Sequence, residues 1–124
     1  MITTAGKNVL RARLEAATAE FAGTFYLAFS TDATTPTIAD TTLTGEQTAN
    51  GLARISVIAA HTVGQNTWTF AATPSYTAST LTTITKIALF DAATGGNMID
   101  VGLVSAVGFT APGDTCPFSL VISL

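Results

Sequence analysis

Apolar and polar residues alternate with a period of two over most of the chain beyond Gly23. In residues 24–30, TFYLAFS, the side chains of Phe25, Leu27 and Phe29 would all face one side of an extended strand. Similar stretches occupy residues 52–63, 67–76, 81–90, 98–105 and 116–124, and Gly, Pro, Asn and Asp residues separate them. Turn signals spaced roughly 8–12 residues apart indicate about seven or eight short strands in a β-sandwich.

The stretch KIALF, at the end of residues 81–90, is apolar at successive positions. This is typical of a strand in the middle of a sheet that is covered on both sides. A strict alternation puts two sets of side chains on opposite faces, with Leu81, Ile87 and Leu89 on one and Ile84, Ala88 and Phe90 on the other.

The last residues also alternate. After the turn signal APGD, one face would carry Cys116, Phe118, Leu120, Ile122 and Leu124. Burying four large apolar side chains contributes about 6–12 kcal/mol before conformational entropy is subtracted. We therefore expect a strand on the inner face of a sheet, with Pro117 near its start, where a missing N–H is tolerated.

Residues 91–97, DAATGGN, connect two of the predicted strands. Asp91 can accept hydrogen bonds from backbone amides two residues further on, and Gly95 and Gly96 permit a positive φ. We interpret this stretch as a hairpin turn rather than as the loop of an active site.

Only residues 4–20 have helical periodicity, with apolar positions at Val9, Leu10, Leu14 and Ala17. Arg11 and Glu15 stand four residues apart and could pair. The narrow apolar face predicts a helix on the flank of the domain or against a neighbour. We expect a single domain, mainly β, with a helical segment at residues 1–22 and an antiparallel, jelly-roll-like β-sandwich at residues 23–124. Residues 31–51 would form a long connection, with room for a short edge strand.

The composition points to a surface that other subunits cover. Charged residues make up 10% of the chain, against about 25% in ordinary soluble domains. Threonine accounts for roughly a fifth of the residues, far above its usual share. Covering a surface of Thr, Ser, Ala and Gly with another subunit costs little desolvation free energy, because no charged group is buried. Such a surface therefore favours permanent assembly. A secreted domain, or one merely rich in threonine, is the alternative.

Charge, apolar run length and cysteine content limit the binding partners and the compartment that we expect. A net charge of −3 with five Lys and Arg residues argues against nucleic acid, which requires a basic stripe. No uninterrupted apolar run is long enough to span a membrane, and the first residues do not resemble a signal peptide. We therefore expect synthesis in the cytoplasm. Cys116 is the single cysteine, so the fold does not depend on an internal disulfide.

No group of residues has the pattern of a catalytic, cofactor or metal site. The single histidine, His61, lies on the apolar side of the strand predicted at residues 52–63 and would need a carboxylate or nucleophile beside it. The acidic residues fall mostly in turns without calcium-loop spacing: Asp32, Asp40, Glu46, Asp91, Asp100 and Asp114. We predict no enzymatic activity and no cofactor.

Aromatic residues allow one binding hypothesis. Tyr26, Trp68 and Tyr76 could form a stacking platform for a sugar, but Trp68 shares a strand face with Phe70, which favours burial of both.

Several segments together resemble a recurring pattern in virion proteins of tailed bacteriophages. These are TTAGKNVLRARL at the start, FYLAFSTDATTPTIADTTLTGE, the hairpin KIALFDAATGGNMIDVG and the terminal GDTCPFSLVISL. The hairpin is the most specific of them. The Cys116–Pro117 pair and the high threonine content depart from the pattern. The resemblance implies a small β-sandwich subunit of a phage particle, either a capsid decoration (cement) protein or a neck, tail or fibre component.

Four hypotheses follow. The first is a cement protein, a dimer or trimer, that binds the major capsid protein on the outside of the shell and stabilises it by burying interface area. Lys7, Arg11 and Arg13 could then meet acidic shell subunits, unless they simply form a solvated helix face. The second is a neck, tail or fibre subunit of the virion. The third is a carbohydrate- or receptor-binding module with Trp68 or Tyr76 exposed. The fourth is a hydrolase built on His61.

Overall fold

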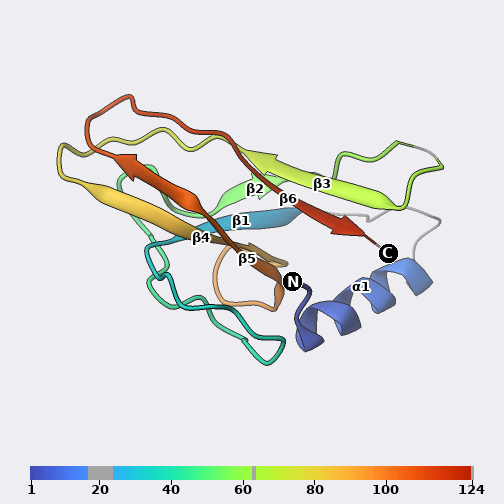
Figure 1. Cartoon of the computed structure of the whole chain (residues 1–124). Helices are drawn as coiled ribbons and strands as arrows, with labels where there is room; N and C mark the ends of the chain where they lie inside the picture. Colours follow the sequence, from blue (N-terminus) through green and yellow to red (C-terminus); the bar gives the residue numbers. More distant parts are fainter. Residues whose placement is uncertain (17–23, 63, 124) are drawn as a thin grey trace.

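The computed structural model describes residues 1–16, 24–62 and 64–123, with the backbone alone given for residues 11–16. One helix, α1 (Thr4–Ala16), precedes six strands. The strands are β1 (Phe25–Ser30), β2 (Ile55–Val57), β3 (Thr67–Ala72), β4 (Thr82–Phe90), β5 (Met98–Phe109) and β6 (Phe118–Ser123). They form a four-stranded sheet in the order β2-β1-β4-β5 and a two-stranded sheet, β3-β6, in a second layer (Figure 1).

The predicted fold class is confirmed, since every strand pair is antiparallel and a single short helix is present in the described residues. β4 lies between β1 and β5, as its doubly apolar sequence indicates. The described part has fewer strands than expected. The connection at residues 31–51 contributes only the isolated bridge between Ser30 and Glu46, and residues 58–62 only that between Ala60 and Thr69.

The main core lies between the two layers. Alternate side chains of β1 meet those of β3 and β6. Phe25 packs edge-on against Phe70, and Phe29 packs at a tilt against Phe118, with ring centroids 5.2 Å apart in both pairs. The inward residues of β6 are Phe118, Leu120 and Ile122, and all three belong to this core. Residues 118–123 therefore form an inner-face strand, as the alternation predicts, while Leu124, predicted on the same face, lies outside the described residues.

A smaller core covers the other face of the four-stranded sheet. Leu43, from the long connection, packs there with Ala88 and Phe90 of β4 and with Met98 and Val101 of β5. The connection thus supplies the second cover that the sequence of β4 requires.

Two strand predictions are corrected by the structure. Ile84 was expected on the same face as Ala88 and Phe90, but it lies in the main core with Ile87 and Leu89. The pairing of β4 with β5 shifts register between Ile84 and Lys86, and this irregularity breaks the simple alternation. Leu81 lies before β4 rather than within it and is 67% exposed.

The strand predicted at residues 52–63 is also much shorter in the structure. Ile55–Val57 pairs with β1, and the chain then passes to the second layer, where the backbone of Ala60 pairs with that of Thr69. Ile58, which follows β2 where the chain leaves the first sheet for the second, is 77% exposed. This segment joins the two sheets along the side where β2 and β3 lie. In the described residues no bridge joins β5 to β6 on the opposite side.

The corrected position of Ile84 predicts a large difference between two neighbouring substitutions. Ile84→Ala removes part of a fully buried side chain and is expected to lower the free energy of unfolding by about 2–5 kcal/mol. Leu81→Ala, on an exposed residue, should change it by no more than about 0.5 kcal/mol. Urea unfolding followed by circular dichroism measures both, and equal effects would contradict the assignment.

Candidate interaction surfaces

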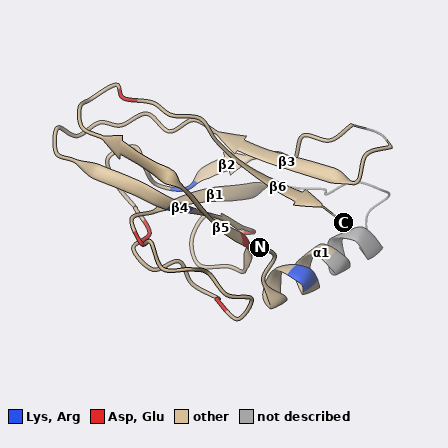
Figure 2. Cartoon of the chain, in the orientation of Figure 1, with Lys and Arg blue, Asp and Glu red and all other residues tan. Residues whose placement is uncertain are grey.

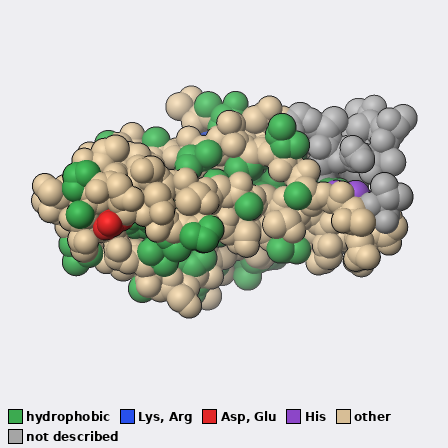
Figure 3. Space-filling model, turned by 90° about the horizontal axis from the view of Figure 1, so that it is seen from above, with side chains coloured by type: hydrophobic (Ala, Val, Ile, Leu, Met, Phe, Trp, Pro, Cys, Tyr) green, Lys and Arg blue, Asp and Glu red, His purple; other side chains and the backbone are tan. Residues whose placement is uncertain are grey.

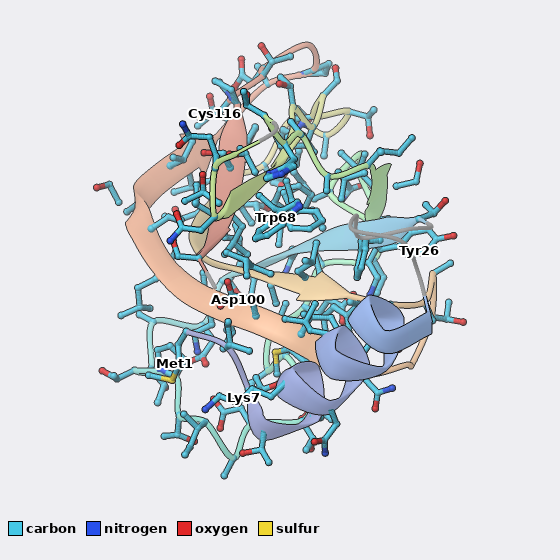
Figure 4. All side chains as sticks on the ribbon, turned by 90° about the vertical axis from the view of Figure 1, so that its right-hand side faces the viewer. Met1, Lys7, Tyr26, Trp68, Asp100 and Cys116 are labelled. Carbon is cyan, nitrogen blue, oxygen red and sulfur yellow. The ribbon has the colours of Figure 1, made fainter. Side chains whose placement is uncertain are left out.

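The start of the chain is fixed to β5. The Thr3 amide donates to the Ile99 carbonyl at 3.0 Å, and the Val101 amide donates to the Met1 carbonyl at 3.0 Å. The α-amino group of Met1 lies 2.6 Å from the buried carboxylate of Asp100 (Figure 4). Residues 1–3 therefore cover the outer edge of β5 over its first half.

The helix α1 begins at this edge. Thr3 is its N-cap, because its hydroxyl accepts a hydrogen bond from the Gly6 amide at 2.9 Å and donates to the Met98 carbonyl. Gly6 is required by close contact, since a Cβ there would lie 2.0 Å from the Ile99 carbonyl oxygen. One turn later Leu10 is buried in the main core. The helix thus packs against its own domain, along β5.

The three cations predicted to dock on a partner lie in this helix. Lys7 is exposed on α1 (Figures 2 and 4). Arg11 and Arg13 lie in the part of α1 whose side chains are outside the described residues, as does the predicted pair of Arg11 with Glu15. The role of these cations as a docking surface stays a prediction.

A second group of charged residues binds the long connection, residues 31–51, to β4 of the four-stranded sheet. Lys86, whose side chain is 6% exposed, donates from Nζ to Asp32 Oδ2 at 2.6 Å, and Thr85 Oγ1 donates to the Asp32 carbonyl at 2.9 Å. The Lys86 ammonium, helped by the Thr34 hydroxyl and amide, lowers the pKa of Asp32 from its ordinary 3.8 to about 2. A polar cleft of about 390 Å³, lined largely by threonines, lies beside this pair.

Arg54 fastens the same connection to the hairpin turn. Its guanidinium binds Glu46 with two hydrogen bonds, of 2.7 and 3.0 Å, and donates at 2.8 Å to the carbonyls of Ala92 and Gly95. It also lies 3.6 Å from the centre of the Phe90 ring. This planar arrangement suits arginine and would be lost with lysine.

The turn at residues 91–97 connects β4 to β5, its antiparallel neighbour. Gly95 and Gly96 have φ values of 59° and 75°. The Asp91 carboxylate accepts from the backbone and side-chain amides of Asn97, six residues on, rather than from amides two residues on as expected. Asp91 and Asn97 therefore close the loop from its two ends.

Among the described residues, charged side chains are almost absent from the β3–β6 layer. Between residues 55 and 85 there is no Asp, Glu, Lys or Arg, and residues 101–124 contain only Asp114. These segments include the whole β3–β6 sheet, and the view onto that layer shows almost no charged side chain (Figure 3). Its outward residues are small and uncharged: Thr67, Thr69, Ala71, Ser119, Val121 and Ser123.

The aromatic residues do not form the exposed platform that a sugar-binding site would require. Trp68 is 8% exposed and Tyr76 1% exposed, and both belong to the main core. The Tyr76 hydroxyl donates to the Thr80 carbonyl at 2.5 Å. Tyr26 is half-buried against the smaller core. The expectation that Trp68 and Phe70 are both buried is confirmed.

His61 is placed by packing rather than by catalytic partners. Its ring stacks on Trp68 with centroids 4.4 Å apart, and Nδ1 lies 2.9 Å from the Thr67 carbonyl oxygen. The described residues that line the shallow pocket beside it are Ala60, Thr62, Gln65, Thr67 and Thr69, and they include neither a carboxylate nor a serine. The hydrolase hypothesis requires one of these beside His61.

Other functional groups are sparse in the described residues. They contain no group of three or more His, Cys, Asp or Glu side chains arranged to hold a metal ion. Cys116 is half-buried and packs against the main core. Within the ranges that the structure describes, no helix is long and apolar enough to cross a membrane.

The charged connection predicts how stability depends on pH. The pKa of Asp32 is lower in the folded chain than in the unfolded chain, so its stabilising contribution is complete above about pH 4 and is lost as the pH falls towards 2. Asp32→Asn should reduce the slope of unfolding free energy against pH in this window. Urea unfolding between pH 2 and 5 tests this, and an unchanged slope would contradict it. Asp40 and Asp114, whose pKa values are lowered by hydrogen bonds from Thr37 and Thr110, retain their own contributions in the variant.

The close contact at Gly6 gives a second prediction. Gly6→Ala should force α1 away from β5 and lower the free energy of unfolding by about 1–3 kcal/mol. The exposed neighbour serves as the control, since Lys7→Ala should change it by no more than about 0.5 kcal/mol. Thermal unfolding compares the two, and hydrogen exchange in α1 shows whether the helix is released.

Comparison with protein families gives a match over nearly the whole chain. The family model of podophage GP4 fiber I protein gp80 matches residues 1–121. No curated protein matches this sequence.

Proposed function

We propose that this chain, which belongs to the podophage GP4 fiber I protein gp80 family, is a structural subunit of a tailed-phage fibre. The observation that carries the proposal is the extent of the match, which includes the helix, the long connection and both sheets except the last two residues of β6. The family supports the resemblance to small virion proteins of tailed phages. It favours the neck, tail or fibre hypothesis over capsid decoration.

The physical design of the chain agrees with a structural role. In the described residues the buried and half-buried ionic groups hold the chain together. Asp32 with Lys86 and Glu46 with Arg54 fix the long connection, and Asp100 fixes the start of the chain. The β3–β6 layer offers other molecules an uncharged surface, which can be covered without stranding a charge.

A carbohydrate- or receptor-binding role has less support. Trp68 and Tyr76 are used as core residues, so neither is available as a stacking surface. The cleft beside Asp32 and Lys86 is polar, and none of the described residues that line it is aromatic.

We also propose that the basic residues of α1 contact another protein of the virion. Lys7, with Arg11 and Arg13 further along α1, offers positive charge at the end of the chain that is packed on β5. An acidic surface on another virion protein would suit these residues.

The proposal predicts the position and the number of copies of the protein. Gold-labelled antibodies against the chain should mark fibres projecting from purified virions, and quantitative mass spectrometry should find far fewer copies than of the major capsid protein. Labelling spread evenly over the shell, with a copy number near that of the capsid protein, would support the decoration hypothesis and overturn this one.

A further inference from the structure

We propose that the outer edge of β6 pairs, antiparallel, with the same edge of a second copy of this chain. The inference concerns how the subunit self-associates and does not depend on its position in the virion. It rests on a comparison of the sheet edges, on the unequal width of the two layers and on the sequence of β6.

Exposed sheet edges carry backbone N–H and C=O groups that can bind another strand, and proteins usually protect them. The edge at β2 is only three residues long. The outer edge of β3 is covered by Ala60, whose backbone exchanges hydrogen bonds of 2.8 and 2.9 Å with Thr69. Each of these edges therefore has a recognised form of protection.

The edge at β5 is protected twice. Residues 1–3 cover its first half through hydrogen bonds to Ile99 and Val101. In its second half the pairing with β4 is irregular, because Ile84 faces Val107 while Lys86 faces Leu103. Irregular pairing bends a strand and makes it a poor template for another one.

Within the described residues, the edge at β6 has none of these protections. Its pairing with β3 is regular over six residue pairs, from Thr67 with Ser123 to Ala72 with Phe118. The strand, FSLVIS, contains no charged residue and no proline, and Pro117 lies just before it. In the part of the chain that the structure describes, no strand pairs with its other edge.

The β3–β6 sheet is also narrower than the sheet that it covers. Two-stranded sheets are marginal on their own, whereas three or more strands with an apolar face are stable. β6 contacts both β4 and β5, so its outer edge lies on the β5 side of the molecule. On that side Val104 and Val107 pack against the main core but remain half-buried, and Leu103 is 48% exposed. Pairing of two copies through β6 would produce one continuous four-stranded sheet.

The sequence of β6 suits pairing with itself. In antiparallel strands, directly opposite residues point to the same side of the sheet. A two-fold axis at Leu120 would place Phe118 opposite Ile122 of the second copy, both facing the cores. On the outer side, Ser119 would lie opposite Val121 of the second copy.

These pairs favour a second copy over a different protein. A two-fold axis brings each residue near its own counterpart, so a charged strand would repel itself, whereas β6 has no charge to repel. The apolar residues of one copy meet those of the other without an unpaired polar side chain.

The test is a set of variants of the full-length chain, with self-association measured by analytical ultracentrifugation over a range of concentrations. The wild type should form a dimer. Ser119→Lys combined with Val121→Lys puts two lysines opposite each other at two places in the proposed register, and should raise the dimer dissociation constant by about tenfold or more. Both positions are exposed, so circular dichroism should show an unchanged fold.

Two further variants separate this register from other arrangements. Ser119→Lys combined with Val121→Glu puts opposite charges across the same pairs and should restore the dimer. Thr69→Lys adds a charge to the outer face of β3, beside Val121 but away from the β6 edge, and should leave the dimer intact. A monomeric wild type, a dimer that survives the double lysine variant, or one that Thr69→Lys abolishes would overturn the proposal.

Discussion

The structure depends on apolar contact between two sheets of unequal width. Phe25 and Phe29 of β1 meet Phe70 and Phe118 of the second layer, and β4 supplies the centre of the wide sheet beneath them. No disulfide contributes to the fold, because the chain has a single cysteine. Burial of these side chains must therefore offset the conformational entropy of the ordered chain. The terminal strand β6 contributes side chains to this core, so unfolding of the β3–β6 layer would expose the core to water.

Charged residues are few, and two of them bind the long connection to the rest of the fold. Arg54 and Lys86 are both largely buried, and each holds a carboxylate of the long connection that follows β1. Opposite charges that are paired at the sheet fix a connection which has little regular structure of its own. This use of charge leaves the β3–β6 layer neutral, and a neutral layer can be covered by another molecule without stranding a charge.

Protection of sheet edges links the fold to the proposed dimer. The chain covers, shortens or bends every edge in the described residues except that of β6. Residues 1–3 are part of this protection, since they bind along β5 before α1 begins. A subunit that assembles through one edge needs the others blocked, because pairing at several edges leads to open aggregates.

The sequence by itself determined the fold class, the doubly covered position of β4 and the inward face of β6. Each of these follows from local alternation of apolar residues, which depends only on the geometry of an extended strand. The helix was also evident from residues 4–20, with Val9 and Leu10 on its bound side, but the sequence left open whether it packs on its own domain or on a neighbour. The resemblance of the hairpin and connection to phage virion proteins agreed with the family match, but it did not separate the shell from the fibre.

Tertiary structure decided the features that depend on distant residues. The face of Ile84 is set by irregular pairing with β5, and the short β2 by the passage of the chain to a second layer. Neither leaves a signal in the local pattern. The contacts of Asp32 with Lys86 and of Arg54 with the hairpin also join residues far apart in sequence, where spacing carries no information. Which edge is left open could be known only once each strand had its neighbours, because pairing is a property of the assembled sheet.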